Sequence, residues 1–231
     1  MAHINIIFLI FNLLAWAVVI YLVYRNYRQL EEPLRIWQVA VVVWVGTLSF
    51  NFQFQVADTL LHLPVIPLGV FFLFVVLKGS QKGWKAYRSL AWLGFKTNFI
   101  FLAAALLAIP IHAFIYPKDD PSTYLADVEE AYVVPIHPSS TNQSLNVEQL
   151  KQQVSRMERS IDVHHDHWFD TYYGRDERFP YQLMGTRSKW GSGLAPVIYV
   201  EQNGQGLLMV TPNRSYYFRA QASFMEKGDA P

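Results

Sequence analysis

An uncharged stretch of 21 residues, 4–24, is the feature that most limits what this chain can fold into. A helix needs about 20 consecutive apolar residues to cross the hydrocarbon core of a bilayer. A secretory signal peptide is the alternative, but it carries basic residues before its apolar segment. The N-terminal MAHIN contains no Lys or Arg, whereas Arg25, Arg28 and Arg35 follow the stretch. The stretch is therefore predicted to be a transmembrane helix.

Three further apolar segments predict three more spans, over residues 36–57, 60–77 and 97–116. The expected fold class is a membrane all-α region of four transmembrane helices over 1–116. A small extracytoplasmic α+β domain over 117–231 is expected to follow it.

The second and third predicted spans contain features that are unusual in a helix. Residues 50–55 read FNFQFQ, and this period of two is typical of extended backbone. The frayed end of a helix at the membrane interface is the preferred interpretation, with a strand as the alternative. Pro64 and Pro67 predict a kink or an irregular first turn at the start of 60–77.

The distribution of Lys and Arg predicts the orientation of the spans, because short cytoplasmic loops are enriched in these residues. Residues 25–35 contain three and residues 78–96 contain five, whereas Lys118 alone lies near the far end of the fourth span. Both loops are therefore expected in the cytoplasm, with the N-terminus and the C-terminal domain outside. Residues 83–95, GWKAYRSLAWLGF, interleave aromatic and basic side chains and predict an amphipathic helix at the membrane interface.

Composition supports a division into two environments and a plasma-membrane location. Residues 1–116 carry a net charge of +5, and residues 117–231 carry −4. The chain has no cysteine, which excludes disulfides, thiolate catalysis and cysteine-based metal sites. An extracytoplasmic domain without disulfides fits a bacterial envelope better than an animal cell surface.

The polar half contains patterns for one helix and four strands, the first of which is the strand-like run AYVVPI at 131–136. Residues 146–161 predict a helix, which Ser144 or Asn146 could cap. Residues 195–212 predict a hairpin around Asn203-Gly204, and residues 215–222 a third strand of an antiparallel meander. Residues 223–231 are expected to be a disordered tail.

Apolar residues on the predicted helix repeat at spacings of three and four. They are Val147, Leu150, Val154, Met157 and Ile161. This stripe predicts a helix docked on its own sheet, and a partner-binding or dimer-forming helix is the alternative.

A cluster of His and Asp over 162–170 is the main candidate for a metal site. Its candidate ligands, suited to zinc or a similar divalent ion, are His164, Asp166, His167 and Asp170. A pH-sensing cluster and a solvated polar surface are the alternatives. No cofactor is otherwise expected.

Three ionisable residues at the outer face of the predicted spans are candidates for an ion path: Asp58, His62 and His112. Headgroup-level placement, without such a role, is the alternative interpretation.

Catalytic motifs are absent from the sequence: it contains no phosphate-binding glycine loop, no GxSxG elbow and no HExxH. The sequence therefore favours a non-enzymatic protein of the plasma membrane. Its outer domain is expected to bind a ligand or another membrane or envelope protein, and not nucleic acid. The sequence is also compatible with a homo-oligomer. A subunit of a transporter or ion-handling complex and a metal-binding outer domain are the alternative functions.

Overall fold

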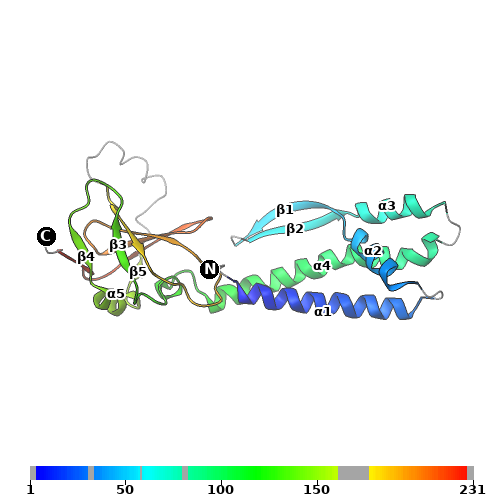
Figure 1. Ribbon diagram of the computed structural model, residues 1–231, viewed down its shortest axis with the longest axis horizontal. Coiled ribbons are helices and arrows are strands. Elements are labelled where there is room, and N and C mark those ends of the chain that lie inside the picture. The colour runs from blue at the N-terminus through cyan, green and yellow to red at the C-terminus, as the bar shows by residue number, and fades with distance from the viewer. Residues whose placement is uncertain (1–3, 31–33, 58, 80–82, 161–176, 228–231) are drawn as a thin grey trace. The chain divides into compact units, whose positions relative to one another are not determined.

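The computed structural model describes residues 4–30, 34–57, 59–79, 83–160 and 177–227 (Figure 1). Its contacts divide the chain into two compact units. The helical unit contains residues 7–111, and the C-terminal unit contains residues 112–231 together with residues 1–6.

Two helices, α1 (Ile6–Arg28) and α4 (Gly83–Ile115), are long and apolar enough to cross a membrane. The mean hydropathy of their most apolar 18-residue stretches is 2.7 and 2.1, and only 11% and 6% of those stretches are buried. A core helix of a soluble protein would bury far more of such a surface. The amphipathic helix predicted over residues 83–95 is the first part of α4 rather than a separate element.

The prediction of four transmembrane helices is wrong for the second and third spans. In place of two long helices, the chain forms two short helices and a hairpin between them. In order these are α2 (Ile36–Gly46), β1 (Phe50–Val56), β2 (Thr59–Ile66) and α3 (Leu68–Leu77). Helices of 11 and 10 residues rise only about 16 Å, half of a typical hydrocarbon core.

The period of two in residues 50–55 explains the change from helix to strand. The antiparallel register pairs Phe54 with Leu61 on one face and Gln53 with His62 on the other. Pro67, which has no N–H to donate, occupies the N-cap of α3, so the helix begins only after it. The strand interpretation of this segment is therefore confirmed, and the frayed-helix interpretation is wrong.

Three glycines allow α2 to approach both α3 and α4 at backbone distance. A Cβ added at Gly94 of α4 would lie 2.3 Å from the carbonyl oxygen of Val43 and 2.9 Å from Cα of Gly46. One added at Gly69 of α3 would lie 1.7 Å from the carbonyl oxygen of Val45. Small residues allow such close helix packing in apolar surroundings. The core of the helical unit forms around this contact, with Val39, Val70 and Leu90 buried.

We expect Gly94→Ala to destabilise the helical unit by about 1–3 kcal/mol, because the new methyl group has no space. Gly79→Ala is the matched control, since a Cβ at Gly79 would meet nothing within 4 Å. Thermal unfolding of the full chain in detergent measures the difference. Equal unfolding temperatures for the two variants would contradict this packing.

The C-terminal unit is built on an antiparallel sheet of six strands in the order β3-β6-β7-β8-β9-β5. Its strands are β3 (Tyr132–Pro135), β5 (Glu158–Arg159), β6 (Tyr181–Met184), β7 (Val197–Val200), β8 (Gly206–Val210) and β9 (Ser215–Arg219). The predicted hairpin is confirmed as β7 and β8, and the predicted third strand as β9. A short second sheet pairs β4 (Gln143–Leu145) with β10 (Met225–Lys227).

Alternating residues of the sheet supply two clusters of buried side chains. In β8, Leu207 and Met209 belong to the main core, whereas Leu208 packs on the other face with Phe179 and Tyr217. The prediction of a disordered tail is wrong for its first residues, because Phe224 is fully buried and β10 pairs with β4.

Helix α5 (Val147–Val154) covers the main core and is shorter than the predicted 146–161. Asn146 is its N-cap, and its side chain accepts a hydrogen bond of 2.9 Å from the backbone N–H of Gln149. Leu150, Val154 and Met157 are buried in the main core, and Val147 packs against it. Ile161 lies outside the described residues. The described residues of the stripe therefore face the core of their own unit, as expected for a helix docked on its own sheet.

Candidate functional site

The residues predicted to form a metal site lie outside the described part of the chain: His164, Asp166, His167 and Asp170. Within the described residues, no group of three or more His, Asp or Glu side chains is arranged to hold a metal ion.

Of the three candidate ion-path residues, one lies outside the described residues and the other two belong to different units. Asp58 lies outside the described residues. His62 lies on β2 in the helical unit, and its Nε2 accepts a hydrogen bond of 3.3 Å from the side-chain amide of Gln53. His112 belongs to the C-terminal unit.

His112 helps to hold a loop of the C-terminal unit against the end of α4. Its Nε2 donates to the carbonyl oxygen of Ser192 at 2.9 Å, and the hydroxyl of Tyr116 donates to the carbonyl oxygen of Trp190 at 2.9 Å. The backbone N–H of Ile6 donates to the carbonyl oxygen of Gly191 at 3.0 Å. Gly191 adopts a φ of +79°, and a Cβ there would lie 2.7 Å from Cδ1 of Ile6.

A polar cleft of about 390 Å³ between the 122–129 segment and α5 is the candidate binding site of the C-terminal unit. Its lining combines hydroxyl, carboxylate and ammonium groups with apolar side chains. The lining residues are Ser122, Leu125, Ala126, Asp127, Val128, Glu129, Lys151, Val154 and Ser155. Since Leu125, Val128 and Val154 are also core residues, the cleft has an apolar floor and a polar rim.

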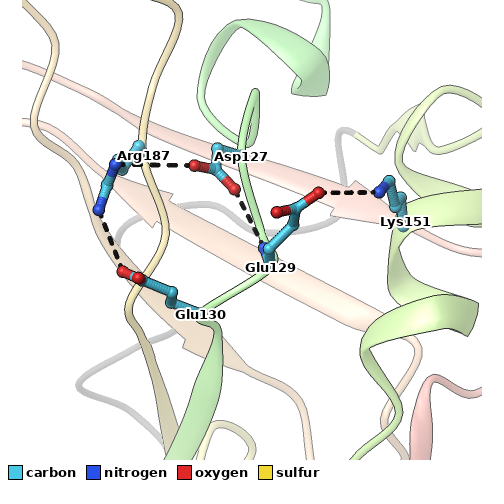
Figure 2. Close-up of polar contacts among 5 residues, drawn as sticks. All are labelled: Asp127, Glu129, Glu130, Lys151 and Arg187. Carbon is cyan, nitrogen blue, oxygen red and sulfur yellow. Dashed lines mark hydrogen bonds and ion pairs between the residues drawn. The ribbon is translucent and has the colours of Figure 1, made fainter.

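Ion pairs link charged side chains at the rim of the cleft and beside it (Figure 2). Lys151 of α5 reaches across to Glu129, with Nζ 3.3 Å from Oε1. Arg187 pairs with Glu130 at 3.0 Å and with Asp127 at 3.9 Å. These side chains are largely exposed, so the pairs add little stability and remain accessible to a ligand.

Backbone contacts hold the acidic segment in place. The N–H groups of Ala126 and Asp127 donate to the carbonyl oxygen of Arg187 at 2.9 and 3.1 Å, and the N–H of Arg187 donates back to Asp127 at 2.9 Å. Gly185 lets the segment approach, since its φ is +77° and a Cβ there would lie 2.0 Å from the carbonyl oxygen of Glu130. The rim is therefore preorganised by the fold.

Asp120 anchors the start of the segment that forms the cleft. Its carboxylate accepts hydrogen bonds from the backbone N–H of Ser122 at 2.9 Å, from the Ser122 hydroxyl at 2.6 Å and from Lys189 at 3.2 Å. Burial alone would raise the pKa of this carboxyl, but the hydrogen bonds from Ser122 and Lys189 hold the pKa below its usual value of 3.8. A carboxylate with a lowered pKa is a weak base, so Asp120 is poorly suited to activate Ser122 as a nucleophile.

A second polar cluster, around Glu201, lies on the other face of the sheet. Glu201 is only 7% exposed; it accepts hydrogen bonds from Nε of Arg178 at 2.8 Å and from the hydroxyl of Tyr217 at 2.9 Å. Burial, together with the neighbouring Glu201 carboxylate, raises the pKa of the Tyr217 hydroxyl. Both carboxylate oxygens of Glu201 accept hydrogen bonds within the protein, so the cluster is a weaker candidate for a ligand site than the cleft.

Sequence reasoning missed the rim of the cleft. Asp127, Glu129 and Lys151 have no motif spacing, because Lys151 comes from a helix and the two acids come from an irregular segment. The acidic run DVEE at 127–130 was the only available signal, and a run of charges is more often a solvated surface.

Comparisons with protein-family models, with curated proteins and with solved structures found no match to this chain.

We expect the hydrogen-bonded Asp120 carboxylate to make stability depend on pH. A group whose pKa is lowered by folding contributes stability above its unfolded pKa, and loses it as the pH falls through the folded pKa. Asp120→Asn should therefore lower the unfolding temperature of the C-terminal unit at pH 6, and the difference from wild type should shrink below pH 3.8. Thermal unfolding of both proteins from pH 6 to pH 3 tests this; a difference independent of pH would contradict it.

Proposed function

We propose that this chain is a non-enzymatic protein of the plasma membrane that presents a binding domain outside the cytoplasm. The observation that carries the proposal is the preorganised polar cleft, in a chain that also contains two long apolar helices. α1 and α4 have the length and hydropathy of membrane anchors. The cleft provides an apolar floor, a rim of both charge signs and two serine hydroxyls.

The proposed orientation follows from the basic residues at the ends of the helices. Arg25 and Arg28 lie in the last turn of α1, and Lys85 and Arg88 lie in the first turns of α4. In the proposed orientation these ends face the cytoplasm, because Lys and Arg are retained on that side. The N-terminus and the C-terminal unit are then outside.

The composition of the cleft suggests the class of ligand. Asp127 and Glu129 can accept hydrogen bonds from cationic or amide groups, and Lys151 can donate to carbonyl or carboxylate groups. A peptide segment of another membrane or envelope protein offers both kinds of group together with apolar side chains. We therefore propose an exposed polypeptide segment as the ligand.

The two alternatives remain proposals that rest on other residues. A role in transport would involve Asp58, His62 and His112, and it is tested by the effect of His62→Ala on ion flux. A divalent metal site would involve residues 162–170, and metal analysis of the purified full chain tests it.

Site-specific photocrosslinking in cells tests the binding role of the cleft. A photoreactive residue at Ser155, on the exposed rim, should form an adduct with one protein partner, and the same residue at Asn213 should not. Ala126→Trp, which fills the cleft, should reduce the adduct at Ser155 at least about tenfold. Ala222→Trp is the matched control, because Ala222 is exposed and outside the cleft.

Two outcomes would contradict the proposal. One is an adduct from Asn213 as abundant as the adduct from Ser155. The other is equal adduct yields in the Ala126→Trp and Ala222→Trp proteins, since a ligand in the cleft cannot tolerate an indole there.

A further inference from the structure

The hairpin of the helical unit leaves backbone groups open beside its most apolar helix. β1 and β2 form a two-stranded sheet, and within the described residues neither outer edge pairs with another strand. In an antiparallel pair about half of the N–H and C=O groups of each strand point away from its partner. In hydrocarbon each unsatisfied group costs several kcal/mol, which is why open sheet edges do not face lipid.

The unpaired backbone groups are costly here because the hairpin lies beside an apolar part of α4. Leu60, Leu61 and His62 of β2, together with Asn51 at the start of β1, line a small pocket with Phe101 and Leu102 of α4. These α4 residues belong to the uncharged stretch 97–115, which is the part suited to lie in the bilayer. The hairpin therefore lies beside a hydrocarbon-level segment rather than beside a polar one.

The two edges differ, and β1 is the open one. β2 packs on α4, with Leu61 and Pro64 buried, whereas no residue of β1 is buried. Pro64 also removes one backbone donor from β2, a device that blocks edge pairing. β1 contains no Pro and no charged residue, so it lacks the features by which natural proteins prevent strand addition.

The side chains of β1 make the strand complementary to itself. One face carries Phe50, Phe52 and Phe54, and the other carries Asn51, Gln53 and Gln55. An amide side chain both donates and accepts, so identical rows of Asn and Gln can hydrogen-bond to each other. The absence of charge means that a second copy brings no like-charge repulsion.

We propose that β1 pairs antiparallel with β1 of a second copy of this chain across a twofold axis, joining two hairpins into a four-stranded sheet. The register shifts between Phe50 and Asn51, so the regular part of the strand begins at Asn51. Overlap of residues 51–55 of the two copies places the axis at Gln53, with Asn51 opposite Gln55 of the second copy, and keeps the amide side chains of both copies on one face. The outer edges of the joined sheet are then the two β2 strands, which α4 and Pro64 already protect. This inference rests on the proposed membrane insertion of α1 and α4 and is independent of the binding cleft.

Disulfide formation between single cysteines tests the pairing, because the chain contains no native cysteine. In membranes that contain the full chain, oxidation of Gln53→Cys should give a covalent dimer of the chain. His62→Cys is the matched control, since His62 pairs directly with Gln53 on the same face of the hairpin. In the joined sheet the two His62 positions lie three strand spacings, about 14 Å, apart. That distance exceeds the reach of a disulfide, so this protein should remain monomeric.

Three results would overturn the proposal: a Gln53→Cys protein that unfolds like wild type but stays monomeric, equal crosslinking of both variants, or crosslinking of Gln53→Cys only to a different protein.

A second pair of variants gives an independent readout. Gln53→Lys would place two ammonium groups opposite each other at the axis and should shift the chain from dimer to monomer in light scattering. His62→Lys, at the same level but on β2, should leave the dimer intact; equal dimer fractions in both would also overturn the proposal.

Discussion

The apolar surface of α1 and α4 is the constraint on which the rest of the structure depends. Very little of their most apolar stretches is buried within the protein. Exposure of so much apolar surface to water is unfavourable, so both helices require apolar surroundings. A bilayer provides these surroundings, but it also removes water as a hydrogen-bond partner. Every backbone group at that depth must then be satisfied by protein.

The elements between α1 and α4 differ in whether their backbone groups are satisfied. α2 and α3 satisfy their own backbones; α2 packs against α4 through Gly46 and Gly94, and α3 packs against α2 through Gly69. The side chain of Asn98 on α4 donates to the carbonyl oxygen of Thr47, just beyond the end of α2, at 2.9 Å. Among the described elements, the hairpin has no strand on its outer edges, and the proposed pairing of β1 with a second copy would satisfy the backbone groups of that strand.

The sequence predicted those elements whose signal is local. The uncharged residues 4–24 predict α1, and Asn146 marks the start of α5. The strand in residues 50–55 was visible as a period of two, but the length and apolar composition of 36–57 outweighed it. The end of the chain could not be predicted, because Phe224 is buried by residues distant in sequence. The cleft was missed for the same reason: the fold alone brings Lys151 to Glu129.

The side of the membrane on which the C-terminal unit lies is the most direct test of the proposed architecture. Single cysteines at Asn213 and Lys85, both exposed, can be labelled with a membrane-impermeant maleimide in intact cells. Membrane anchoring by α1 and α4 with cytoplasmic basic ends predicts that Asn213→Cys is labelled in intact cells. Lys85→Cys should be labelled only after permeabilisation. Labelling of both positions in intact cells, or the reverse pattern, would contradict a membrane-anchored domain that faces outward.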